Sequence, residues 1–213
     1  DGIGILVNRG GSAQNEQTSR REKPSTAISI ANSGHLNLLG NGSAGIVVNN
    51  KNASKEGVMI VNSGLLTLRG SSTTGIKVFN AHGDIAIQNT GSIEITKPTT
   101  TLKTISNAQQ PIDTPAKTLG IHASAADGNV IIKNLNAPNA NNVLQISGAD
   151  YVRGIDGRIT GNNGNLTIVN QMNVSLQEGS KNVGIIGTRR TESLNSTNQT
   201  LNDGWIQINN DGD

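Results

Sequence analysis

The chain has 213 residues, of which 1% are aromatic and none is cysteine, and its formal net charge at pH 7 is +2. So few aromatic side chains argue against an ordinary globular core, and without cysteine neither a disulfide nor a thiolate metal site can form. The small net charge, with no basic stripe interleaved with aromatic residues, argues against nucleic-acid binding, and no apolar run is long enough to span a membrane.

A repeating unit of three strands organises the chain. It is clearest in residues 74–97, where three short runs alternate apolar and polar residues with period two. Two or three residues, mostly Gly, Asn, His or Thr, separate the runs. Period two predicts strands, and no helical period fits the stretch. Three strands in about 24 residues, with a corner after each, predict one coil of a parallel β-helix.

Taken in chain order, the repeat predicts five full coils and a sixth that stops after its second strand. Coil one has strands at 2–8, 26–31 and 35–39; coils two to five span 45–69, 74–97, 120–148 and 154–178; coil six begins at 184 and resumes at 204–209. Three insertions interrupt the coils, at 9–25, 98–118 and 188–203. We therefore predict that 1–213 is a single all-β segment, a right-handed three-faced parallel β-helix (solenoid), and that it belongs to a longer protein.

Equivalent positions in successive coils are expected to form columns along the axis. The first run supplies an inward isoleucine column, Ile5, Ile46, Ile76, Ile121, Ile155 and Ile185. The second run ends each time in asparagine, at Asn32, Asn62, Asn89, Asn134, Asn170 and Asn210, and in four coils glycine follows two residues later, at Gly34, Gly64, Gly91 and Gly212. We expect the asparagines to tolerate a left-handed backbone and to bond one another along the axis, and the glycines to allow a sharp corner.

The recurring pattern G-I-x-V-N, I-x-I-x-N-x-G and x-L-x-L-x-G resembles the passenger domains of Gram-negative autotransporters, which use type V secretion. The nearest resemblance is to the adhesin-like passengers of fusobacteria and helicobacters, and passengers of two-partner-secreted haemagglutinins look similar. The resemblance implies a β-helix exported through the outer membrane and displayed at the cell surface by a C-terminal barrel that this sequence does not include. It further implies a monomeric segment that adheres to a host cell-surface protein or glycan, or to another bacterium.

Two other functions remain open from the residues themselves. Parallel β-helices also serve as polysaccharide lyases and glycosidases, which need clustered carboxylates. The column Lys77, His122 and Asp156 on the outer face of the first sheet is the one constellation suited to proton transfer, and its plain interpretation is a solvated surface ladder. His35 and His82 are expected to be solvated at corners. We predict no enzyme activity, no cofactor and no metal site; an inert spacer stem is the third possibility.

Candidate ligand-binding residues lie in and beside the insertions. The first and last insertions each carry an arginine pair, Arg20 with Arg21 and Arg189 with Arg190, and paired arginines can bind carboxylates or acidic sugars through bidentate contacts. Both insertions are expected to leave the same corner, between the first and second strands, whereas 98–118 leaves from a different one. Trp205 is expected to point outward, where a sugar could stack on it or the insertion could cover it.

Overall fold

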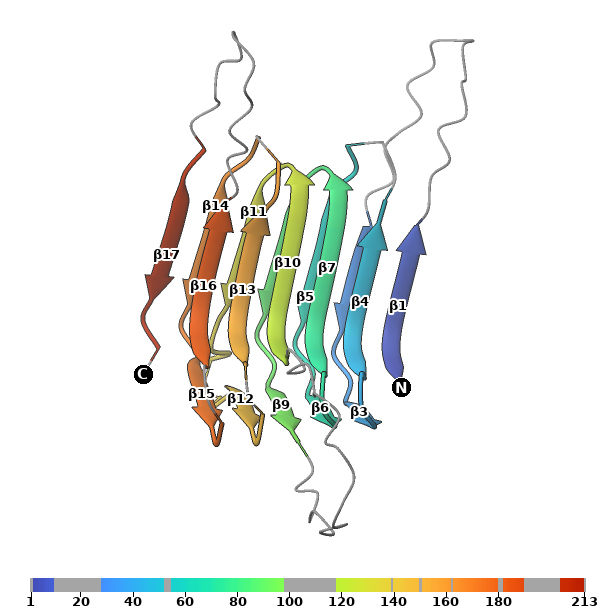
Figure 1. Ribbon diagram of the computed structural model, residues 1–213, viewed down its shortest axis with the longest axis vertical. Coiled ribbons are helices and arrows are strands. Elements are labelled where there is room, and N and C mark those ends of the chain that lie inside the picture. The colour runs from blue at the N-terminus through green and yellow to red at the C-terminus, as the bar shows by residue number, and fades with distance from the viewer. Residues whose placement is uncertain are drawn as a thin grey trace, which may run out of the picture.

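The computed structural model describes residues 2–9, 28–51, 55–97, 118–138, 140–149, 151–161, 163–179, 182–189 and 204–212. These residues form seventeen strands and no helix, so no helix among them is long and apolar enough to cross a membrane. Figure 1 shows the strands stacked in chain order from the N-terminal to the C-terminal end.

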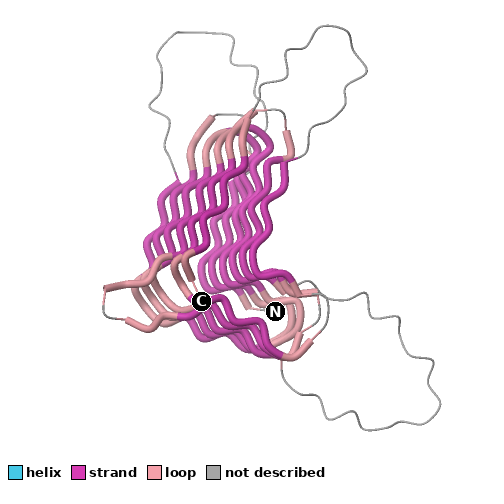
Figure 2. The backbone as a smooth tube through the Cα atoms, turned by 90° about the vertical axis from the view of Figure 1, so that its left-hand side faces the viewer, coloured by secondary structure: helices cyan, strands magenta, loops and turns pink. Residues whose placement is uncertain are grey.

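Three parallel sheets enclose the interior, as Figure 2 shows in a view turned by 90°. The first sheet has the order β1 (Ile3–Arg9), β4 (Ala44–Asn50), β7 (Thr74–His82), β10 (Leu119–Asp127), β13 (Arg153–Ile159) and β16 (Val183–Arg189). The second has β2 (Ile28–Asn32), β5 (Val58–Asn62), β8 (Ile85–Asn89), β11 (Val130–Asn134), β14 (Leu166–Asn170) and β17 (Ile206–Asn210). The third has β3 (Leu36–Leu39), β6 (Leu66–Arg69), β9 (Ile93–Thr96), β12 (Val143–Ser147) and β15 (Asn173–Gln177). The predicted all-β, three-faced parallel β-helix is thereby confirmed.

The isoleucine column lies in register through all six strands of the first sheet. Its four inner members, Ile46, Ile76, Ile121 and Ile155, have no solvent-exposed surface, while the members in the two end coils are partly buried. Stacked Ile, Val and Leu from the three sheets fill the interior without an aromatic side chain. Burial of each such side chain contributes about 1.5–3 kcal/mol, so the columns hold the coils in one register.

The predicted asparagine ladder is present along the second sheet. In each step the Nδ2 amide donates to Oδ1 of the next coil at 2.7–2.8 Å, through Asn32, Asn62, Asn89, Asn134, Asn170 and Asn210. The same amide of Asn62 also donates to the carbonyl of Gly64, two residues on. The left-handed backbone that we expected at these positions is wrong, because the described non-glycine residues with positive φ are Ser72, Tyr151 and Glu178. The asparagines are extended strand residues, and their side-chain amides donate hydrogen bonds to backbone carbonyls in the corner that follows.

The corner glycines act through close packing and not through a left-handed backbone. Gly64 and Gly91 are not among the glycines with positive φ. A Cβ atom built on Gly64 would lie 1.9 Å from the carbonyl oxygen of Gly34, and one on Gly91 would lie 1.9 Å from that of Gly64. Glycine is therefore needed here because successive corners stack backbone directly on backbone.

Two further stacked amides lie near the C-terminal ends of β4 and β7 in the first sheet, and they were not foreseen from the sequence. Asn50 and Asn80 are both fully buried, and Asn50 Nδ2 donates to Asn80 Oδ1 at 2.9 Å. Asn80 Nδ2 in turn donates to the carbonyl of Glu56 at 2.9 Å and more weakly to that of Asp84. These bonds tie the end of β7 to the corner loops that lead into the second sheet.

The strands reach slightly into the expected insertions. β1 includes Arg9, and β16 includes Thr188 and Arg189, so the insertions at 9–25 and 188–203 begin one and two residues later than predicted. Thr118 is buried just before β10, and the remaining residues of all three insertions lie outside the described ranges. The first and last insertions each join a strand of the first sheet to one of the second, whereas 98–118 joins the third sheet to the first.

Candidate functional site

An open groove of about 470 Å³ lies at the corner between the first and second sheets. Its described lining residues come from four successive coils: Lys55, Gly57, His82, Gly83, Asp84, Asp127, Gly128 and Asn163. We call this the corner groove. It lies at the corner to which the first and last insertions are attached, and the attachment of 98–118 is at another corner.

A repeated tripeptide builds the corner groove. His82-Gly83-Asp84, Asp127-Gly128-Asn129 and Asn163-Gly164-Asn165 occupy equivalent positions, each immediately before a strand of the second sheet. The central glycines all have positive φ, and a Cβ atom on Gly128 would lie 2.4 Å from the carbonyl oxygen of Gly83. At the glycine positions, therefore, the corners carry no side chain, and the backbone of one corner stacks directly on the backbone of the next.

The third residue of each tripeptide links one coil to the next. Asp84 Oδ1 accepts from the backbone N–H of Asn129 at 2.8 Å, Asn129 Oδ1 accepts from that of Asn165 at 2.9 Å, and Asn165 Oδ1 accepts from that of Trp205 at 3.1 Å. These bonds use side-chain oxygens to satisfy backbone donors that the turn leaves without a strand partner. The first residue of each tripeptide, His82, Asp127 or Asn163, lines the groove.

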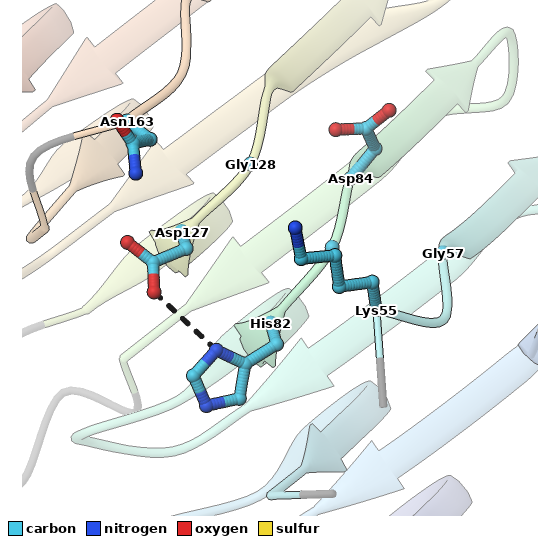
Figure 3. A pocket seen from close by; sticks show the side chains of 8 residues that line it. Lys55, Gly57, His82, Asp84, Asp127, Gly128 and Asn163 are labelled. Carbon is cyan, nitrogen blue, oxygen red and sulfur yellow. Dashed lines mark ion pairs between the residues drawn. The ribbon is translucent and has the colours of Figure 1, made fainter. Parts of the chain in front are cut away.

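Charged groups of both signs face the corner groove, as Figure 3 shows. His82 and Asp127 are register partners at the ends of β7 and β10, and His82 Nδ1 lies 3.3 Å from Asp127 Oδ2. Both side chains are a little over 40% exposed, so His82 is solvated at a corner, as expected. The carboxylate of Asp127 beside it was not foreseen. Lys55 and Asn163 add further donors, and Asn163 and Asp127 add acceptors. Such a surface suits a polar ligand rich in hydroxyl groups or in charges of both signs.

The column of Lys77, His122 and Asp156 is in register on the first sheet, as predicted. The expectation that it forms a solvated ladder is wrong at Asp156, which has 0% exposure. The guanidinium groups of Arg153 and Arg158 cover this carboxylate with hydrogen bonds of 2.6 Å from Arg153 Nη1 and 2.9 Å from Arg158 Nε and Nη2. Asp156 is therefore not placed to exchange a proton with a substrate.

Of the remaining predicted site residues the structure describes Trp205 and Arg189, and it brings Arg189 to the backbone of Gly204, the residue before Trp205. Trp205 is 48% exposed, and its backbone N–H and carbonyl bond to Asn165 and Leu166. Arg189 is half-buried, and its Nη1 donates to the carbonyl of Gly204 at 2.8 Å, across the two ends of the last insertion. Neither residue is among the described lining of the corner groove. Arg20, Arg21 and Arg190 lie outside the described residues.

No group of three His, Asp or Glu side chains within the described ranges is arranged to hold a metal ion. Comparison with known proteins found no matching family model, no matching curated protein and no matching solved structure.

Proposed function

We propose that this chain is a surface-displayed β-helical passenger segment of the autotransporter type, and that it binds a ligand in adhesion to host cells or to other bacteria. The observation that carries the binding proposal is the corner groove, which is lined by Lys55 and by the first residues of three equivalent tripeptides from stacked coils, His82, Asp127 and Asn163. A rigid solenoid that presents a polar groove along its axis is a common way to hold a recognition surface. The proposal of export and surface display is supported by the repeat pattern of the sequence alone.

The chemistry of the corner groove favours binding without a chemical step. Glycoside hydrolysis uses two carboxyl groups that face each other across the scissile bond, one of them free to give a proton. Asp84 Oδ1 is occupied by the backbone and side-chain amides of Asn129, and Asp127 lies against His82. Lys55 and the exposed imidazole of His82 can hydrogen-bond a hydroxyl-rich or charged ligand, such as a cell-surface glycan.

A matched pair of double variants tests the proposal. We expect Lys55→Ala with Asp127→Ala to weaken binding to a glycan array and to cultured epithelial cells by roughly tenfold, because it removes charge-assisted hydrogen bonds. The control, Lys133→Ala with Glu94→Ala, removes the same charges from outer faces of the second and third sheets. Unchanged binding in the groove variant, or equal loss in both variants, would show that the groove is not the binding surface.

Deletions address the neighbouring insertions in the same assay. Shortening 10–25 or 190–203 removes chain attached at the corner of the groove, and shortening 98–117 removes chain attached at another corner. We expect the first two deletions to reduce binding with little change in melting temperature, and the third to leave binding intact. Loss of binding on removal of 98–117 alone would contradict the assignment to this corner.

A further inference from the structure

The outer face of the first sheet carries a buried carboxylate between two arginines. Asp156 has no exposed surface, although its position in β13 places its side chain on the outside of the solenoid. Arg153 lies three residues before it and Arg158 two residues after it, and both bond its carboxylate. Strict alternation would put Arg153 and Asp156 on opposite faces, so the alternation is interrupted between them, at Gly154. A Cβ atom there would lie 2.5 Å from the carbonyl oxygen of Gly184.

This arrangement leaves positive charge and unused donors facing water. Two guanidinium groups against one carboxylate give a formal local charge of +1, since arginine stays protonated in proteins. Arg158 binds Asp156 side-on through Nε and Nη2, and Arg153 binds it through Nη1 alone. The side chains of Arg153 and Arg158 are 26% and 34% exposed. Within the described residues neither guanidinium makes another hydrogen bond, so Arg158 Nη1 and Arg153 Nε and Nη2 retain donors.

A histidine and a lysine extend this surface along the sheet. His122 is the register partner of Asp156 in β10, and its Nδ1 lies 3.4 Å from Asp156 Oδ2 but has no hydrogen-bond partner among the described residues. Lys77 follows in the same column one coil further, and its side chain is exposed. The described groups facing this cluster are therefore mostly basic, with Asp156 as the one carboxylate within bonding distance.

We propose that Arg153 and Arg158, held in place by Asp156 and flanked by His122, form a binding site for an oxoanion group, the sulfate or carboxylate of an acidic glycan. Asp156 is a positioning residue here, because it fixes both guanidinium groups and so reduces the conformational entropy lost when a ligand binds. Arginine forks match planar or tetrahedral oxoanions through paired N–H donors. This site lies on the outer face of the first sheet and its donors are basic. The corner groove lies at the corner between the first and second sheets and contains both acids and bases, so the two sites can be tested separately.

Titration followed by NMR on the isotope-labelled chain of 213 residues tests the site directly. The probes are a heparin-derived hexasaccharide, inorganic sulfate, and cellohexaose as an uncharged control. We expect the hexasaccharide to shift the Nε–Hε signals of Arg153 and Arg158 and the amide signals of His122 and Asp156, and cellohexaose to shift none of them. Shifts with sulfate but not with the hexasaccharide would support an oxoanion site that takes small free anions. No shift at these groups with either anion would overturn the proposal.

Variants then separate a built site from general attraction of a polyanion to a basic surface. We expect Arg158→Gln to lower hexasaccharide affinity roughly tenfold and Arg158→Lys to lower it by less, since lysine keeps the charge but not the fork. The matched control is Arg69→Gln, which removes an exposed arginine from β6 in the third sheet. Circular dichroism melting of each variant checks folding, and the direct titration of the unaltered chain does not depend on it. Equal loss in Arg158→Gln and Arg69→Gln would contradict a built site.

Discussion

Replacement of Ile76 by aspartate is expected to destabilise the solenoid by more than about 4 kcal/mol and to unfold several coils around β7. Ile76 has no exposed surface and lies between Ile46 and Ile121 in the stacked column. The substitution removes an apolar side chain from the interior and puts in its place a carboxylate with no partner. Chemical denaturation followed by circular dichroism measures the change in the free energy of unfolding.

The next residue in the chain provides the control. Lys77 lies on the outer face of the same strand and is exposed. Lys77→Asp should change the free energy of unfolding by about 0.5 kcal/mol or less, since surface substitutions of this kind have small effects. Comparable destabilisation by the two substitutions would mean that the inward and outward faces of β7 are wrongly assigned.

Substitution of Asn62 by alanine should cost about 2–3 kcal/mol of stability, because it interrupts the amide ladder in its interior. Asn62 is fully buried; its Nδ2 donates to Asn89 Oδ1 and to the carbonyl of Gly64, and its Oδ1 accepts from Asn32. The variant removes the acceptor of one Asn32 amide hydrogen and the donor to Asn89 Oδ1, and buried polar atoms that lose their partner are costly. Urea denaturation of the variant and the unaltered chain gives the difference.

Thr67→Ala is the comparison for this effect. Thr67 lies on the outer face of β6, and its hydroxyl contacts His35 Nε2 at 3.1 Å in an exposed position. Because water can replace this contact, the expected change is about 0.5 kcal/mol or less. If the two alanine variants unfolded at the same urea concentration, the asparagine ladder would not be a major source of stability.

The repeat allowed the fold and the column positions to be predicted from the sequence. Period two assigns each residue of a run to the inner or outer face, and the recurring asparagine marks the end of the second strand in every coil. Together they align Ile76 with Ile121 and Asn62 with Asn89, and both alignments are observed. The reason for the corner glycines was missed because it lies in the stacking of one corner on the next, which a single coil does not contain.

The candidate binding surfaces were harder to predict because they depend on residues outside strict alternation. Asp156 is buried by long arginine side chains from its own strand, and the alternating pattern specifies the direction of a side chain but not what covers it. The corner groove combines residues up to 108 positions apart, from Lys55 to Asn163. A usable signal was present in the repeated tripeptide with central glycine, at His82-Gly83-Asp84 and Asp127-Gly128-Asn129.

The stacking register places the groove residues of different coils at one corner, and engineered disulfides test it most directly. The chain has no cysteine, so a pair introduced by His82→Cys and Asp127→Cys is the only possible bridge. These two are register partners in adjacent parallel strands, which lie about 4.8 Å apart, within disulfide range. In the control, Thr67→Cys with Gln145→Cys, the cysteines share a column two coils apart, roughly 9.6 Å, and should not bridge. Mild oxidation and mass spectrometry are predicted to show a disulfide in the first pair alone; a disulfide in the control, or none in the first pair, would contradict the register and with it the corner groove.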